Sequence, residues 1–212
     1  MAFGINSFKS NLVGGGARPS LFEVSLTFPA RLSSTRYTTR GVDALEGPEA
    51  AGDPTPIGAS KFLVKGASIP ASTIGTYDVF FHGRAVKVAG DRTFDTWETT
   101  IINDEDYGIR IAIEQWMDLI AEHKLNIRNK FLDTKEGESA IYKQSLKVTQ
   151  FSKTGKDIHH YHFLGAFPTA LSTIALDWGT QEIEEYTCTW TYDRWMPGRA
   201  GEHQLTSENH PD

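Results

Sequence analysis

Apolar and polar residues alternate along much of the chain, as they do in strands that bury one face. In residues 22–28, Phe22, Val24 and Leu26 point to one side and polar residues to the other. Near the end of the chain the pattern recurs, with an apolar face made of Tyr186, Cys188, Trp190 and Tyr192. The same alternation predicts further strands over residues 61–69, 76–88 (interrupted near Gly83), 94–102, 145–151 and 157–166. The last two are expected to form a hairpin.

One stretch changes to a helical period. Its apolar residues recur at spacings of three and four, at Ile109, Ile113, Trp116, Met117 and Ile120. Asn103 or Asp104 is expected as the N-cap, with acidic residues 104–106 in the first turn and His123 and Lys124 at the other end. Many strands and one helix predict a mainly β protein, a β-sandwich or small barrel with the helix packed against it.

The chain of 212 residues is long enough for one domain with a sizeable core. We expect that domain over residues 17–196, preceded by a flexible lead-in over residues 1–16. Residues 31–60 lose all periodicity and are rich in Gly and Pro, so they are expected to form a long loop insertion. Residues 197–212 have no apolar pattern and are expected to be a mobile tail.

The overall charge argues against a protein that clamps nucleic acid. The net charge is −6, whereas binding to phosphates needs clustered Lys and Arg. Cys188 is the only cysteine, which excludes an internal disulfide and a multi-cysteine metal site. No signal peptide is evident at the N-terminus, and no apolar run is long enough for a membrane span.

Two groups of residues suggest enzymatic or metal chemistry, and each has a simpler interpretation. His160 and His162 would share a face of a strand and are weak metal candidates, because no third ligand lies nearby. Glu182, Glu184 and Glu185 suggest a glycosidase pair, but acidic residues at the start of a strand are common. Polar residues on the surface of a sheet are the favoured explanation of both groups.

Other catalytic signals are weaker still. Cys188 alternates with aromatic residues on a face expected to be buried, where a cysteine behaves as a small hydrophobe. Lys153–Lys156 lacks the first glycine and the Ser or Thr of a phosphate-binding loop, and no GxSxG or HExxH motif is present. The sequence therefore predicts no enzyme activity and no cofactor.

Several short motifs, in a fixed order, carry a resemblance to a known family. They are VAGDRTFDTW (88–97), IINDE (101–105), IEQW (113–116), GAFPT (165–169) and LDW (176–178). With them, the chain resembles the tail tube proteins of contractile-tailed bacteriophages of the T-even type over residues 17–196. The loop over residues 31–60 and the stretch after Met196 are longer than the family's usual form.

The resemblance implies a β-sandwich subunit that forms hexameric rings, stacked into a hollow tube inside a contractile sheath. Its implied partners are other copies of the chain, the sheath protein, the baseplate protein that starts the tube and the tail terminator. DNA would pass through the lumen without specific binding, in a virion assembled from protein made in the host cytoplasm. Alternatives are the tube of a related injection or secretion system, a baseplate initiator or, more remotely, a carbohydrate-binding β-sandwich with exposed aromatic residues.

The resemblance also marks candidate assembly residues rather than catalytic ones. They are Gly90, Asp91, Arg92, Asp95, Trp97, Asp104, Glu105, Phe167, Pro168, Asp177 and Trp178. Gly90 and Asp91 are expected to form a turn. Arg92 is expected to pair with Asp91, Asp95 or a neighbouring subunit, and Trp97 to anchor the core. We hypothesise that residues 31–60 bridge to a neighbouring subunit or ring.

Overall fold

The computed structural model describes residues 5–29, 32, 61, 63–105, 107–124 and 142–199. The expected loop insertion over residues 31–60, most of the expected tail, and Asp106 at the expected helix start lie outside these residues. Strands dominate the part described, as the alternating pattern predicts. Among the helices of these residues, none is long and apolar enough to cross a membrane.

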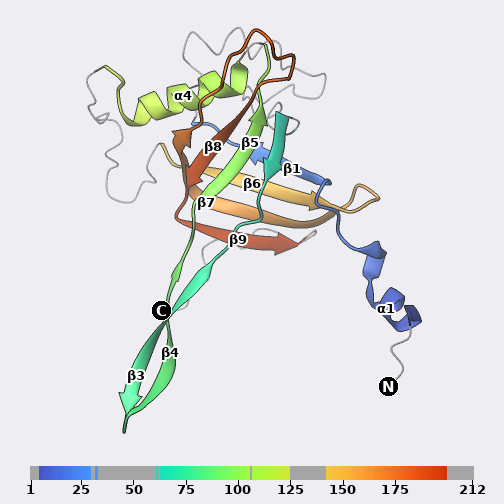
Figure 1. Ribbon diagram of the computed structural model, residues 1–212, viewed down its shortest axis with the longest axis vertical. Coiled ribbons are helices and arrows are strands. Elements are labelled where there is room, and N and C mark those ends of the chain that lie inside the picture. The colour runs from blue at the N-terminus through green and yellow to red at the C-terminus, as the bar shows by residue number, and fades with distance from the viewer. Residues whose placement is uncertain are drawn as a thin grey trace.

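Seven strands form two layers that share one long strand (Figure 1). The first layer pairs β1 (Phe22–Leu26), β6 (Gln144–Phe151), β7 (Asp157–Leu171) and β9 (Arg194–Arg199) in that order. The second layer pairs the end of β7 with β8 (Glu185–Thr191), then β5 (Trp97–Ile102) and β2 (Val64–Ala67). All of these pairs are antiparallel. The sheet runs from β1 to β2 and is not closed, so the sandwich prediction is confirmed and the barrel alternative is wrong.

Strand β7 passes from one layer to the other at Gly165. Up to Ala166 it pairs with β6, and up to Leu164 with β9, whereas from Phe167 onward it pairs with β8. Gly165 has a φ of 68°, which favours glycine, and a Cβ there would collide with the side chain of Asp193. The Asp193 carboxylate accepts hydrogen bonds from Lys143 Nζ at 2.7 and 2.8 Å, which fixes the carboxylate beside the bend.

The core is built from aromatic residues between the layers. Trp97 of β5 stacks on Phe163 of β7, with ring centroids 4.3 Å apart. Trp190 of β8 lies 5.7 Å from Trp116 of the helix. The indole N–H of Trp190 donates to Thr99 Oγ1 at 2.9 Å, so that this buried polar group is satisfied. The predicted burial of Trp97, Trp116 and Trp190 is confirmed.

Helix α4 (Gly108–Ile120) packs its apolar stripe on the sandwich, as predicted, but its ends differ from expectation. The N-cap is Tyr107 in the left-handed region, and no acidic residue lies in the first turn. Asp104 lies outside the helix, and its Oδ1 accepts a hydrogen bond from the Gly108 N–H at 3.1 Å. It therefore provides a partner for one of the backbone N–H groups that the helix itself leaves unpaired. The helix ends at Ile120, before His123 and Lys124, so the predicted basic C-terminus is wrong.

The expected lead-in contains a helix, α1 (Ile5–Asn11), and a 3-10 turn, η1 (Val13–Gly15). Two other expectations need correction. The strand predicted over residues 76–88 is a hairpin of β3 (Thr73–Phe81) and β4 (Arg84–Thr93). The expected tail does not begin at Pro197, since β9 continues to Arg199 on the edge of the first layer.

Replacing Trp97 by alanine tests whether the aromatic stack holds the two layers together. Trp97→Ala should lower the free energy of unfolding by about 3–5 kcal/mol, because it leaves a large cavity between the layers. Trp178→Ala is the matched control: Trp178 is fully exposed, so its loss should change the monomer by less than about 0.5 kcal/mol. Urea unfolding of the two variants measures both values, and equal losses would contradict the packing described.

Candidate assembly interface

The hairpin β3–β4 projects from the sandwich as a separate two-stranded sheet (Figure 1). Its strands pair from Thr73↔Thr93 to Phe81↔Arg84. They are joined by His82 and Gly83, with φ values of 48° and 79°. Two consecutive positive φ values define the type I′ turn that suits a two-residue hairpin. With 9 residues in β3, the arm reaches about 30 Å from its base.

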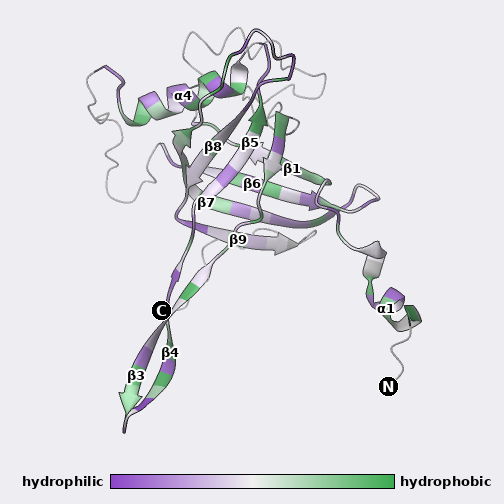
Figure 2. Cartoon of the chain, in the orientation of Figure 1, coloured by the Kyte–Doolittle hydropathy of each residue, from purple (hydrophilic) through white to green (hydrophobic). Residues whose placement is uncertain are grey.

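Apolar and polar residues alternate along both strands of the hairpin (Figure 2), so its two faces differ in character. The cross-strand pairs Tyr77↔Val88 and Val79↔Val86, together with Phe81, lie on one side. We call these five residues the apolar face of the hairpin. The opposite face carries the ion pair between Asp78 and Lys87, at 3.5 Å, and also Phe80 near the tip. Tyr77, Val79, Phe80, Phe81 and Val86 all remain exposed.

The base of the hairpin is fixed to the core. The indole N–H of Trp97 donates to Ser68 O at 2.8 Å, and that of Trp195 donates to Ala71 O at 3.2 Å. Phe94, just after β4, packs its ring 6.3 Å from that of Trp195. The segments that enter and leave the hairpin are therefore held by the same aromatic residues that fill the sandwich.

The motif residues 90–97 lie along this arm and its base, although not in the expected geometry. Gly90 and Asp91 are strand residues that form a bulge in β4 opposite Gly75, so the predicted turn is wrong. A Cβ at Gly90 would lie 3.2 Å from the Gly75 carbonyl oxygen, which explains the need for glycine by close approach of two backbones. Within the described part of the chain, Arg92 forms no ion pair with Asp91 or Asp95.

The other candidate assembly residues lie elsewhere in the molecule. Phe167 and Pro168 belong to β7, where Phe167 packs against Tyr142 at 5.3 Å and Pro168 is buried. Asp104 and Glu105 precede α4. Asp177 and Trp178 lie in the exposed segment between β7 and β8. The structure therefore does not gather the motif into one site.

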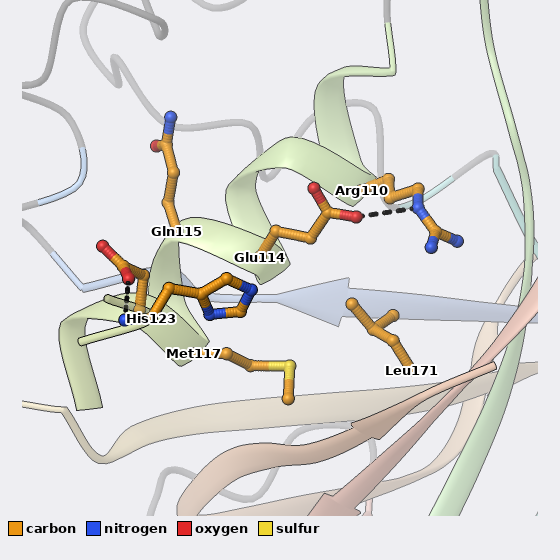
Figure 3. Close-up of a pocket in the computed structure, with 7 residues that line it drawn as sticks. Arg110, Glu114, Gln115, Met117, His123 and Leu171 are labelled. Carbon is orange, nitrogen blue, oxygen red and sulfur yellow. Dashed lines mark hydrogen bonds and ion pairs between the residues drawn. The ribbon is translucent and has the colours of Figure 1, made fainter. Parts of the chain in front are cut away.

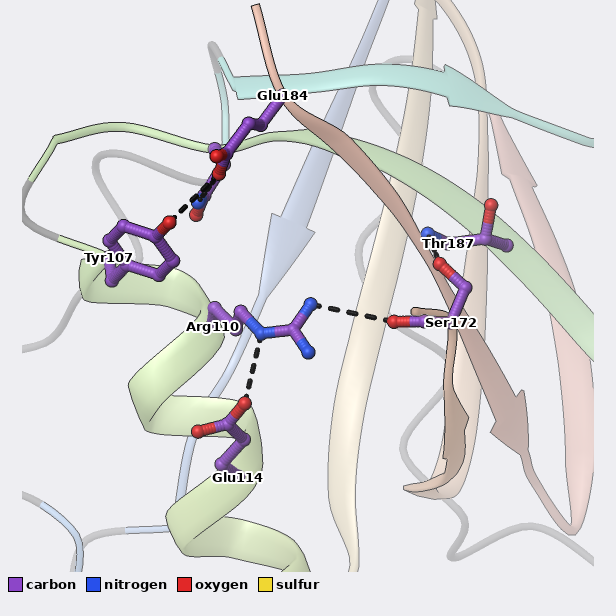
Figure 4. A network of polar contacts seen from close by, with 7 residues as sticks. Tyr107, Arg110, Glu114, Ser172, Glu184 and Thr187 are labelled. Atoms are coloured by element: carbon purple, nitrogen blue, oxygen red, sulfur yellow. Dashed lines mark hydrogen bonds and ion pairs between the residues drawn. The ribbon is translucent and has the colours of Figure 1, made fainter. Parts of the chain in front are cut away.

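A polar network holds that segment, residues 172–184, to the start of α4 (Figure 4). Glu184 Oε2 accepts hydrogen bonds from Asn103 Nδ2 at 2.8 Å and from the Tyr107 hydroxyl at 2.9 Å. The bond from Asn103, and then that from Tyr107, lower the pKa of Glu184 below its usual range. Arg110 donates to Glu114 at 2.9 Å and to the Ser172 carbonyl at 3.5 Å. Both ends of the segment are thus attached to the helix.

Two of the three carboxylates considered for catalysis, Glu184 and Glu185, have structural partners, and the cysteine is buried. Glu185 pairs with Lys65, and Glu184 belongs to the network just described. Burial raises the pKa of the Cys188 thiol well above its usual range, which disfavours the thiolate that a nucleophile requires. These positions fit structural roles.

A shallow hollow of about 490 Å³ lies beside α4 (Figure 3). Its lining is Arg110, Glu114, Gln115, Met117, Asp118, His123 and Leu171. Arg110 is already engaged by Glu114, and the Asp118 carboxylate accepts the His123 backbone N–H at 2.9 Å. These polar groups therefore complete the surface of the helix rather than converge on a ligand.

His160 and His162 lie on one side of β7, as predicted, with ring centroids 5.0 Å apart. Asp157 Oδ2 lies 3.5 Å from His160 Nδ1. In the residues that the structure covers, no group of three or more His, Cys, Asp or Glu is arranged to hold a metal ion. Burial, followed by the charges of His160 and Lys147, lowers the pKa of His162 below its ordinary value of 6.5.

The residues missed at the sequence level are the exposed apolar ones of the hairpin. Alternation over Tyr77, Val79 and Phe81 predicts a strand, but a pattern of period two does not reveal whether its apolar face is covered. The signal that marks the hairpin is the pair His82–Gly83 between two apolar runs.

Other proteins of known structure share this fold. A chain in the cryo-EM structure of the anti-feeding prophage tube-terminating cap matches with a TM-score of 0.56 and 16% identity, covering 87% of this chain and 92% of that chain. A chain in the sheath–tube complex of an extracellular contractile injection system in the extended state matches with a TM-score of 0.51 and 15% identity, covering 90% and 97%. These likenesses show a shared fold.

Sequence similarity then gives the family. The model of the phage tail tube protein family matches residues 17–197. The tail tube proteins gp19 of Enterobacteria phages T4 and T6 are 32% and 31% identical over 136 residues, which cover 63% of this chain and 79% of each relative. The chain belongs to the phage tail tube protein family. It therefore has a structural role in a tail tube and is a component of the virion.

The lowered pKa of His162 predicts a pH dependence of stability. The unfolded chain binds a proton at this site near pH 6.5, whereas the folded chain does so only at lower pH. Stability should therefore fall as the pH drops from about 6.5 to the lowered pKa, and this contribution should stay constant below that value. Urea unfolding between about pH 8 and pH 5 measures the free energy of unfolding. It should decrease less steeply with falling pH for His162→Gln than for the unchanged chain. Identical slopes would exclude a destabilising proton at His162.

Proposed function

We propose that the chain self-assembles into hexameric rings that stack to form the inner tail tube of a contractile phage tail. The observation that carries the proposal is the exposed apolar face of the hairpin in a member of the tail tube family. The protein acts by assembly and not by catalysis.

An isolated two-stranded hairpin is only marginally stable in water, because neither face is covered. The hairpin here exposes three aromatic residues, Tyr77, Phe80 and Phe81, on an arm away from the core. Covering this surface with another copy removes apolar area from water, which favours association by roughly 25 cal/mol per Å² before the costs of association. The arm is therefore best explained as a contact between subunits.

The position of the arm also favours a tube. It extends to one side of the subunit, so the surface that it meets on another copy differs from the arm itself. Such heterologous contacts form rings when the rotation closes and filaments when it does not. In a tube of stacked rings, one heterologous contact closes each ring and a second one repeats from ring to ring.

The remaining parts of the proposal follow from the family and from charge. A conduit for DNA must not hold phosphates tightly, and a net charge of −6 agrees with such a lumen. The partners are other copies of the chain, the sheath, the baseplate protein that starts the tube and the tail terminator, and synthesis takes place in the host cytoplasm. Arg92, unpaired with Asp91 or Asp95, is available for a carboxylate on a neighbouring subunit.

Neighbouring roles on the same fold are the tube of an injection system and a baseplate initiator. Identity to phage tail tube proteins, above 30%, favours the phage role over the injection-system fold relatives at about 15%. A carbohydrate-binding module is disfavoured by membership of the tail tube family. Trp97, Trp116 and Trp190 are buried and not available to stack on a sugar, although Trp178 is exposed. Nearby genes for capsid and terminase would favour the phage role over an injection system.

Electron microscopy of the purified protein tests the assembly. We expect six-fold rings or tubes from the unchanged chain, and a folded monomer from Val79→Asp, because a carboxylate then lies on the apolar face of the hairpin. Thr76→Asp is the matched control, since it adds the same charge to the same strand on the opposite face. A strict monomer for the unchanged chain at high concentration would refute the proposal.

A further inference from the structure

Residues 172–184 form a second exposed apolar surface, outside the hairpin. Leu176 and Ile183 are largely exposed, and Trp178 is fully exposed, although tryptophan usually buries most of its surface. The charged residues of the segment are Asp177, Glu182 and Glu184, and it contains no Lys, Arg or His. We call residues 172–184 the acidic loop.

The acidic loop is held in place although its apolar side chains are free. At its start, the Ser172 N–H donates to Thr187 O at 2.9 Å and the Thr187 N–H donates to Ser172 Oγ at 2.8 Å. In its middle, Asp177 Oδ1 accepts from the Gly179 N–H at 2.9 Å, which fixes the turn around Trp178. The network at Glu184 holds its end. A fixed loop presents an apolar side chain without losing much conformational freedom on binding.

The tip of the hairpin has the complementary character. Arg84 faces the same side as Phe81, its cross-strand partner, and so adds a positive charge to the apolar face. In the described residues Arg84 makes no ion pair, whereas Lys87 on the other face is already paired with Asp78. An apolar face with an unpaired guanidinium matches an apolar loop whose carboxylates make no ion pair within the described residues.

The two surfaces lie at opposite ends of the subunit. In Figure 1 the hairpin extends to one end of the longest axis, while the acidic loop lies beyond the far end of the sandwich, near α4. One copy therefore cannot satisfy its own surfaces, but two copies aligned along this axis can. Such head-to-tail contacts are heterologous and repeat without limit.

We propose that the apolar face of the hairpin of one copy docks on the acidic loop of the next copy along the tube. Phe81 and Val79 lie against Trp178 and Leu176, and Arg84 pairs with Glu182 or Asp177. This inference rests on the proposed assembly into a tube, and it names the surface that receives the hairpin.

Cross-linking between two variants, each with one added cysteine, tests the contact. One variant carries Val86→Cys on the apolar face of the hairpin, and the other carries Gln181→Cys on the acidic loop. Cys188 is buried and its raised pKa disfavours reaction, so it contributes little background. When the two variants are co-assembled and oxidised, disulfide-linked dimers should form in much higher yield than when either is assembled alone.

Lys87→Cys is the matched control, because it lies next to residue 86 with its side chain on the opposite face. Its yield with Gln181→Cys should be several-fold lower. Tubes that form without the Val86–Gln181 cross-link, or with equal yields from both hairpin positions, would contradict this docking and leave the proposed tube intact. A chain that never assembles would overturn both proposals.

Charge reversal gives an independent readout. Arg84→Glu should raise the protein concentration needed for tube formation about tenfold, as should Glu182→Arg together with Asp177→Arg. Arg84→Glu combined with both loop reversals should restore assembly toward that of the unchanged chain, because the charges are exchanged rather than lost. Additive losses in the combined variant would show that the two surfaces do not meet.

Discussion

The contacts of Trp97 join the three parts of the molecule on which assembly depends. Its ring stacks on Phe163 across the sandwich, and its indole N–H holds the chain at Ser68, where the hairpin begins. One side chain therefore fixes the distance between the layers and the position of the arm. A hairpin that is hardly stable alone can then project from the body in a defined direction.

The charged motif around Trp97 is explained by this arrangement. Gly90 allows the two backbones of the arm to approach. Phe94 packs against Tyr192 and Trp195 where the chain returns from β4 to the sandwich. Asp104 satisfies the first N–H of α4 from outside the helix. These contacts of Gly90, Phe94 and Asp104 attach a projecting arm and a helix to the core, and they form no catalytic arrangement.

Strands and helices with a strong hydrophobic period were predictable from the sequence, whereas features that depend on tertiary contacts were not. The strand containing Val24 and Leu26, the strand containing Cys188 and Trp190, and the body of α4 all follow from burial of one face. Strand β9 was missed because it lies on an edge and contains Pro197 and Gly198, which weaken any strand pattern. The pattern over residues 76–88 predicts only a strand interrupted near Gly83, and not a projecting hairpin. Whether the apolar face of the hairpin is covered depends on a partner, which no periodicity within one chain can show.

Hydrogen exchange of the hairpin amides, compared between monomer and assembled protein, measures the central claim most directly. The amides of β3 and β4 should exchange rapidly in the monomer, because little covers them, and become protected on assembly. The amides of β8, in the middle of the second layer, serve as an internal reference that should change little. Unchanged exchange of β3 and β4 in assembled tubes would contradict a role for the hairpin as the contact between subunits.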